Sequence, residues 1–279
     1  MAFIVFAGSL LLGGCSWEAA APAKPQSEKP SADTSASTLP QGTNTSNSSS
    51  ENLLLVMENA VLQYPSRNDE WEYNVYDCYI ELTDYIGPET AALSVPGEIE
   101  GLLVWSLNTG RIFDNNIRGE YNDILTSVEF PDGLRVIGDE TFLWCRELNS
   151  FSLPNTLLII GKDAFADCSM ASLTIPHGVK VIEEGAFDGA SFTTSTAQHI
   201  IIPSSVEEIG RVAFRGVGYQ YQSPSGTNYY PDGYEITIEN PDTQLGESCF
   251  EAADVIYGHA GSTAAQYCAE YDMVFQLLE

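Results

Sequence analysis

Cysteine, histidine and carboxylate side chains are the groups in this sequence that could do chemistry. The chain has 6 cysteines and 3 histidines among 279 residues. No C-x-x-C pair occurs, and no cysteine stands near a histidine as a thiol nucleophile and its base would. The G-x-S-x-G, H-E-x-x-H, P-loop and G-x-G-x-x-G patterns are absent as well. We therefore expect no catalytic residue, no metal site and no cofactor.

Acidic residues dominate the charge of the chain. Its 39 Asp and Glu against 11 Lys and Arg give a formal net charge of −28. Such a chain lacks the basic patches that bind phosphate, so the charge argues against an anionic lipid surface as a partner and excludes nucleic acid. The simplest interpretation of the acidity is solubility, and the alternative is attraction to a basic partner or to divalent cations. No EF-hand loop supports a calcium site.

The cysteine nearest the N-terminus is the one with a chemical context. An apolar run of about a dozen residues ends at Leu12-Gly13-Gly14-Cys15, which resembles a bacterial lipobox. This resemblance implies a signal peptide over residues 1–14 and a lipid on the Cys15 thiol, although no Lys or Arg precedes the apolar run. An ordinary cysteine near a cleaved signal is the alternative. Residues 15–52 are rich in Ala, Pro, Ser and Thr and predict a disordered linker.

A repeat governs the rest of the chain. An apolar-x-apolar triplet ends at Pro131, and apolar residues follow at plus three and plus six, then Gly138 and Phe142. The pattern recurs after Pro154, Pro176 and Pro203, with Glu183 in the place of one glycine, and a degenerate copy ends at Phe250. The first three prolines are spaced 23 and 22 residues apart, and a period in the twenties is typical of a solenoid.

Each repeat predicts one coil. The triplet has strand alternation, the proline ends the strand, and the glycine allows a tight conformation of the chain. One aromatic residue per coil closes it over a shared core: Phe142, Phe165, Phe187, Phe214 and Phe250. Cys145 and Cys168 share one phase and should stack inside as small apolar residues, whereas a bond between Cys249 and Cys268 is an open possibility.

The unit LTSVEFPDGLRVIGDETFLWCREL closely resembles the BspA-type leucine-rich repeats of bacterial surface proteins. The resemblance implies a repeat solenoid of short β-strands and turns with little helix. It also implies an N-terminal β segment and first coil over residues 53–124. The repeats then occupy residues 125–279 and end in a strand, a G-x-x-G-S-T turn and a short helix that form a C-terminal cap.

The longest insertion in the repeats follows Phe214 and is rich in tyrosine. Exposed tyrosines are common at interfaces, so the insertion is a candidate contact surface; the alternative is a loop or strand pair that covers the core. Its candidate contact residues are Tyr219, Tyr221, Tyr229, Tyr230 and Tyr234.

The resemblance implies a non-catalytic cell-surface protein that binds other proteins, in the manner of adhesins for host or matrix proteins. Such a protein would be exported and held at the outer face of a bacterial membrane by its lipid alone. The alternatives are a glycan-handling or hydrolytic accessory protein and a structural spacer without a ligand. The residues between the apolar triplet pairs do not form a carboxylate or aromatic cluster that would favour the former: Glu129, Ser152, Thr174, Ile201 and Thr237.

Overall fold

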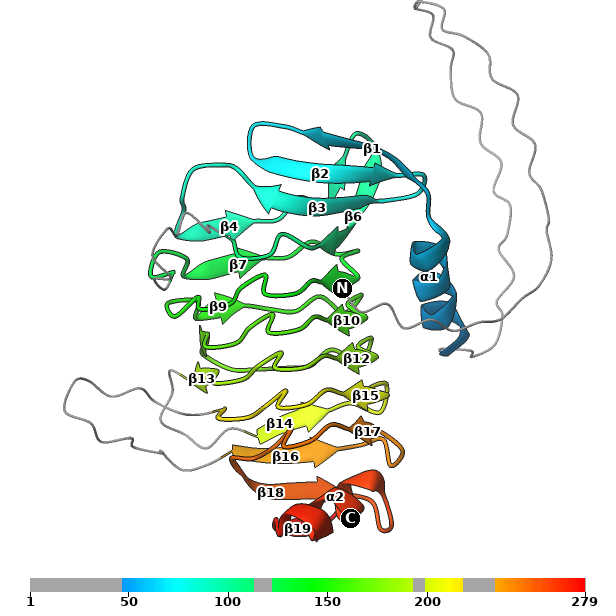
Figure 1. The fold of residues 1–279 in the computed structure, drawn as a ribbon, viewed down its shortest axis with the longest axis vertical. Coiled ribbons are helices and arrows are strands. Elements are labelled where there is room, and N and C mark those ends of the chain that lie inside the picture. The colour runs from blue at the N-terminus through cyan, green and yellow to red at the C-terminus, as the bar shows by residue number, and fades with distance from the viewer. Residues whose placement is uncertain (1–46, 113–121, 193–198, 218–233, 279) are drawn as a thin grey trace, which may run out of the picture. The chain divides into compact units, whose positions relative to one another are not determined.

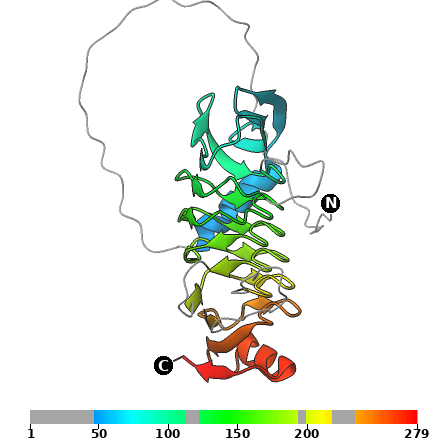
Figure 2. The same cartoon turned by 90° about the vertical axis from the view of Figure 1, so that its left-hand side faces the viewer.

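The structure is a computed structural model that describes residues 47–112, 122–192, 199–217 and 234–278. These residues belong to one compact unit, Thr45–Glu279. The described part contains mostly short strands and two helices, α1 (Asn47–Asn59) and α2 (Thr263–Tyr271), as Figure 1 shows. The successive coils stack on one another, which is clearest edge-on in Figure 2.

The main sheet runs through all the coils. It begins with an antiparallel meander and continues as a parallel ladder in which each coil contributes one strand. The meander is β1 (Leu62–Arg67), β2 (Trp71–Tyr76) and β3 (Ile80–Tyr85). The ladder is β6 (Leu102–Leu107), β8 (Val136–Ile137), β10 (Ile159–Ile160), β12 (Val181–Ile182), β15 (Glu208–Ile209) and β17 (Gln244–Leu245), and β5 (Glu98–Ile99) pairs beside β6. The sheet ends at β1 and β17 and does not close on itself.

Three smaller sheets are formed by other phases of the coils. All of their strands are parallel. One sheet contains β4 (Ala92–Ser94), β7 (Ser127–Glu129) and β9 (Ser150–Phe151); a second contains β11 (Ser169–Met170) and β13 (Ser191–Phe192). The third contains β14 (His199–Ile202), β16 (Tyr234–Ile238), β18 (Ala253–Gly258) and β19 (Phe275–Leu277).

The longest ladder does not lie where the triplets predicted it. It consists of the residues at plus five and plus six after each proline, such as Val136–Ile137 and Ile159–Ile160. The triplets form strands in several coils, but the one at Leu173–Ile175 has no strand assignment. A strand of two residues has only one inward and one outward side chain, so it leaves no alternation to recognise in the sequence.

The core of the stack is a column of phenyl rings. Phe142, Phe165, Phe187, Phe214 and Phe250 are each 0 % exposed. Neighbouring rings stack with centroids 5.2, 5.5, 5.2 and 5.7 Å apart along the column. The coils are therefore joined by aromatic contacts inside as well as by backbone hydrogen bonds at the sheets.

The glycines at plus seven are needed for a reason that differs from the predicted one. A Cβ on Gly161 would lie 2.6 Å from the carbonyl carbon of Gly138, and one on Gly210 would lie 2.4 Å from the backbone nitrogen of Glu184. These positions have ordinary φ, and it is the backbone of the preceding coil that leaves no room for a side chain. The left-handed conformation occurs instead two residues before each phenylalanine, as at Glu140 (φ 56°) and Asp163 (φ 53°).

Different elements stand at the two ends of the repeat array, with helix α1 before it and helix α2 and strand β19 after it. Helix α1 begins at Asn47, so the last residues of the predicted linker 15–52 are helical rather than disordered, and the apolar run from Leu53 to Met57 continues that helix. At the other end, Ser262 caps α2 by accepting a hydrogen bond from the Ala265 N–H (3.2 Å). Strand β19, which the sequence did not predict, then pairs with β18.

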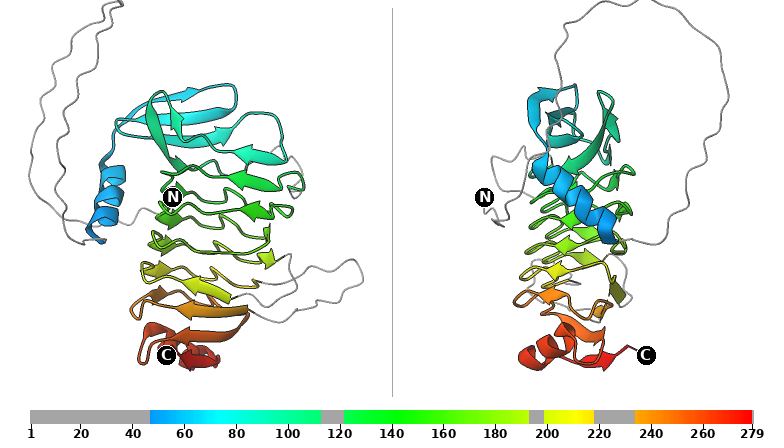
Figure 3. Two further views of the ribbon diagram at one scale, coloured as in Figure 1. Left: turned by 180° about the vertical axis from the view of Figure 1, so that it is seen from behind. Right: turned by 90° about the vertical axis from the view of Figure 1, so that its right-hand side faces the viewer.

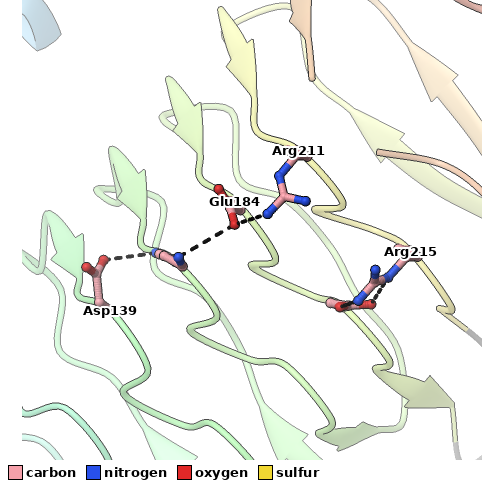
Figure 4. Close-up of polar contacts among 6 residues, drawn as sticks. Asp139, Glu184, Arg211 and Arg215 are labelled. Carbon is pink, nitrogen blue, oxygen red and sulfur yellow. Dashed lines mark hydrogen bonds and ion pairs between the residues drawn. The ribbon is translucent and has the colours of Figure 1, made fainter. Parts of the chain in front are cut away.

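A row of charged side chains links the coils on one side of the stack, as Figure 4 shows. The Lys162 Nζ lies 3.5 Å from the Glu184 Oε1, which also accepts a hydrogen bond from Arg211 at 2.6 Å. Arg215 binds both carboxylate oxygens of Asp188 in the preceding coil. These pairs are exposed to solvent and contribute little stability, but they occupy several of the few basic side chains.

Candidate functional site

Outward side chains of the triplets form a surface that we call the triplet face. It comprises the exposed positions of β4, β7 and β9 and, further along the stack, those of β14, β16 and β18. Because residues in register on neighbouring parallel strands point the same way, each position forms a row from coil to coil. Ala92, Ser127 and Ser150 make one such row.

An open groove of ≈ 500 Å³ lies over β4, β7 and β9. Four serines line it, together with Glu129 and the half-buried rings of Phe130 and Phe151: Ser94, Ser127, Ser150 and Ser152. The two rings meet edge to face with their centroids 6.4 Å apart. Hydroxyl groups beside partly exposed rings can both hydrogen-bond and pack, which is the mixture that protein interfaces use.

At the other end of the triplet face lies a small polar and aromatic cluster. The His199 Nε2 is 2.8 Å from the Thr237 Oγ1, and the His199 ring lies 5.6 Å from that of Tyr257. The Tyr257 hydroxyl donates to Glu235 at 3.3 Å. Ile201, in register with Thr237, is 48 % exposed. No hydroxyl or thiol nucleophile in this cluster has both a base and a group that orients the base, so the geometry suits contact rather than catalysis.

The cysteines of the described region are free thiols rather than disulfides. Cys78, Cys145, Cys168, Cys249 and Cys268 are all free. Burial raises the pKa of the Cys249 thiol to about 12 and that of Cys268 to about 11. The Cys168 thiol donates to the Phe142 carbonyl oxygen at 2.9 Å inside the core. The possible Cys249–Cys268 bond is thus not formed, and these thiols have the character of buried apolar residues.

The candidate contact residues of the tyrosine-rich insertion fall into two groups. Tyr219, Tyr221, Tyr229 and Tyr230 lie outside the described residues, as does Cys15. Tyr234 is described and is only 1 % exposed. Its hydroxyl donates to the Phe214 carbonyl oxygen at 2.8 Å. Tyr234 is therefore part of the core, where it opens β16, and it is not a surface contact.

Within the residues that the structure describes, no three His, Cys, Asp or Glu side chains gather closely enough to hold a metal ion. In the same residues, neither helix is long and apolar enough to cross a bilayer.

Comparison with protein families gives the repeats a name. Residues 120–221 match the BspA type leucine rich repeat region, in six copies. These residues are BspA-type leucine-rich repeats. The matched segment contains the columns of phenylalanine and glycine described above, from Phe142 to Gly210. Beyond it, the stack of coils continues through β16 and β17 to α2.

Solved structures of bacterial leucine-rich repeat proteins are also similar. A leucine-rich repeat protein of T. pallidum (TpLRR) is 18 % identical, with a TM-score of 0.45 over 76 % of this chain and 98 % of that one. A leucine-rich cell surface protein of Faecalibacterium prausnitzii is 17 % identical, with a TM-score of 0.37 over 70 % and 84 %. The pneumococcal vaccine antigen PcpA is 15 % identical, with a TM-score of 0.36 over 72 % and 51 %. A search of curated protein sequences finds no match.

The function that the repeat family suggests is interaction with other proteins. The described geometry is compatible with that role, since it offers outward faces and a groove. Sequence reasoning recognised the positions of the triplet face but missed the groove. Its lining comes from three coils, whose register was not visible before the strands were paired.

Proposed function

We propose that this chain is a non-catalytic, lipid-anchored protein of the bacterial cell surface that binds another protein, with adhesion to a host or matrix protein as the biological role. The observation that carries the proposal is the BspA-type repeat region. Its capped solenoid would present the triplet face and the tyrosine-rich insertion to the partner. The strongly acidic charge supports a protein partner over nucleic acid.

The proposed site of lipid attachment is the thiol of Cys15. A signal peptide over residues 1–14 would be removed, and residues 15–46 would then separate the lipid from the first described element. The full chain, produced in a bacterium with a basic residue restored before the apolar run, should partition into detergent and carry lipid. Cys15→Ala should remain in the aqueous phase, whereas Cys78→Ala should behave as the parent. Equal partitioning of Cys15→Ala and the parent would refute the anchor.

Binding is tested at the two proposed contact surfaces. Ser150→Arg would fill the groove over β4, β7 and β9 with a long side chain, and replacement of residues 218–233 by a short Gly-Ser link would remove the insertion. We expect one or both changes to weaken retention of an immobilised matrix protein by about tenfold, since a few buried anchor residues carry most interface energy. The control is Glu208→Arg, an exposed residue of β15 on the main sheet. Retention that survives both changes would refute the assignment of these surfaces.

The insertion experiment has a second readout. If residues 218–233 make a contact surface, their replacement should leave the thermal midpoint nearly unchanged, because loop length has a small entropic effect on stability. A large fall in the midpoint would show instead that the insertion covers the core.

A further inference from the structure

The sheet that contains β14, β16 and β18 ends at β19, and this last strand has one free edge. β19 pairs with β18 on one side only. Figures 1 and 3 show it next to α2 at the C-terminal end of the stack. No hydrogen bond joins its other edge to a residue that the structure describes. Such an edge is a template for another extended chain, because its backbone donors and acceptors are unpaired.

The hydrogen bonds to β18 determine which backbone groups of β19 are free. The Leu278 N–H donates to the Gly258 carbonyl oxygen at 2.9 Å. Backbone groups of successive strand residues face opposite edges, so the N–H and C=O of Gln276 also face β18, in keeping with the register of the pair. The N–H and C=O groups of Phe275 and Leu277 therefore point to the free edge.

β19 lacks the features that usually protect an exposed edge. β1, which ends the main sheet, contains Pro65 and Arg67, and a proline or a charge on an edge strand discourages further pairing. β19 contains neither. Val274, directly before β19, is 55 % exposed, and Leu277 within it is 60 % exposed. The edge therefore offers backbone hydrogen bonds together with apolar side chains, which is the combination that strand addition uses.

Charge around β19 indicates which kind of segment fits this edge. No Lys or Arg follows Arg215 in the sequence, whereas Asp and Glu recur throughout the same stretch. Three exposed carboxylates lie near the start of β19, one in β18 and two at the end of α2: Asp254, Glu270 and Asp272. A basic segment would be attracted to this end of the stack, whereas a second copy of the chain would bring like charges together.

We propose that the free edge of β19 binds an extended segment of a basic protein partner, which adds to the sheet as a further strand. The segment's backbone pairs with Phe275 and Leu277. Its apolar side chains contact Val274 on one face of the sheet and Leu277 on the other, and its flanking Lys or Arg side chains approach Asp254 and Asp272. This inference rests on the proposed protein-binding role, and it adds a contact at a sheet edge to those on the triplet face.

The first test is binding of a dye-labelled peptide, Lys-Lys-Val-Thr-Val-Thr-Val-Lys-Lys, to the full chain in a non-ionic detergent, followed by fluorescence anisotropy. One comparison peptide has Glu in place of every Lys. The other keeps the Lys residues but has methylated backbone nitrogens at the Val and Thr residues, so these cannot donate hydrogen bonds. We expect only the first peptide to bind. Absence of that binding, or equal binding of the methylated peptide, would overturn strand addition.

Leu277→Pro tests the edge from the side of the protein. It removes one N–H from the free edge and leaves the hydrogen bonds of Gln276 and Leu278 to β18 in place, so the thermal midpoint should stay close to that of the parent. We expect affinity for the basic peptide to fall at least about tenfold. Leu277→Ala is the matched variant, because it shortens the same side chain but keeps the N–H, and it should weaken binding less. Equal losses in the two variants would refute a backbone contact.

The charge of the partner is tested separately. Asp272→Asn keeps a residue that tolerates the left-handed conformation of this position (φ 55°) and removes one charge near β19. Affinity for the basic peptide should fall about threefold. Glu98→Gln is the control, since Glu98 is an exposed residue of β5 in the first coil. An equal loss in both variants would mean that the peptide responds only to net charge, and this result would overturn the site.

Two further outcomes separate this proposal from its alternatives. A chain that sediments as a dimer, and that Leu277→Pro returns to a monomer, would overturn the basic segment in favour of a second copy. A matrix protein that the parent and Leu277→Pro retain equally well would overturn the edge contact while leaving the surface-binding role intact. A chain that binds the basic peptide through β19 but retains no protein would support the edge and refute the broader role.

Discussion

Phe165 lies inside the phenylalanine column, between Phe142 and Phe187, and replacing it by alanine tests how the coils are held together. Its ring is 0 % exposed and stacks on three others, those of Phe142, Phe151 and Phe187, at 5.2, 5.1 and 5.5 Å between centroids. Removal of a buried phenyl ring costs about 3–5 kcal/mol through lost transfer energy and the cavity left behind. Each aromatic pair adds roughly 0.5–1.5 kcal/mol. We therefore expect a loss near the upper end, about 5 kcal/mol.

The assay is equilibrium urea unfolding, followed by circular dichroism and by intrinsic fluorescence. Phe130→Ala is the matched comparison, because Phe130 is only half-buried and meets Phe142 and Phe151 edge to face. It should cost about 2 kcal/mol, less than a fully buried ring. Phe165→Leu keeps most of the volume and should remain folded even if the alanine variant does not. If Phe165→Ala cost no more than Phe130→Ala, the aromatic column would not be the main contact between coils.

Three more outcomes are expected. Gly161→Ala should destabilise the protein by at least about 2 kcal/mol in the same urea assay, because the new Cβ would meet the Gly138 backbone. Gly97→Ala is the control and should cost much less, because its Cβ would come no closer than 3.3 Å to another atom, the Cβ of Pro131. Burial raises the pKa of both Asp163 and Glu183. The native state therefore binds these protons before the unfolded chain does as pH falls towards the ordinary carboxyl range of about 4, and the thermal midpoint should rise. Glu183→Gln should reduce that slope, and an unchanged slope would contradict the assignment. Deletion of residues 258–279 should uncover the last coil and cause aggregation measurable by light scattering, whereas a folded monomer would argue against a capping role for α2.

The repeat register is the part of the fold that the sequence predicts well. Phe142 and its equivalents in the next three coils recur at a fixed distance after a proline, and this spacing is visible in the sequence alone. The BspA-type resemblance followed from the same positions. The predictions for the ends were less complete, since the strand at Phe275–Leu277 depends on pairing with β18, and the helix that begins at Asn47 opens in a polar run of Asn and Ser.

Features that depend on contact between coils were harder to predict. The plus-seven glycines were attributed to their own backbone conformation, although their role is to admit the backbone of the neighbouring coil. Tyr234 was grouped with the insertion before it, but it is the first residue of β16, and its hydroxyl donates a hydrogen bond to the Phe214 carbonyl oxygen inside the core. A cavity beside α1 brings together Met57, Glu81 and Glu183, which are far apart in sequence, and no local pattern relates them.

The glycine column also bears on how such a chain can change its length over evolutionary time. Because each coil meets the next through the same bare strip of backbone, a whole unit can be duplicated or lost by recombination and the new neighbours will still fit. A gain of part of a unit within that strip would bring a side chain against the neighbouring backbone, whereas the extra residues after Phe214 leave Phe250 in its column, 5.7 Å from Phe214. Whole coils can therefore be gained or lost, and smaller gains are accommodated where they follow the phenylalanine of a coil. The coil with Glu183 is the exception, because Glu183 lines the cavity beside α1 together with Glu81, and an extra unit between them would separate these two walls.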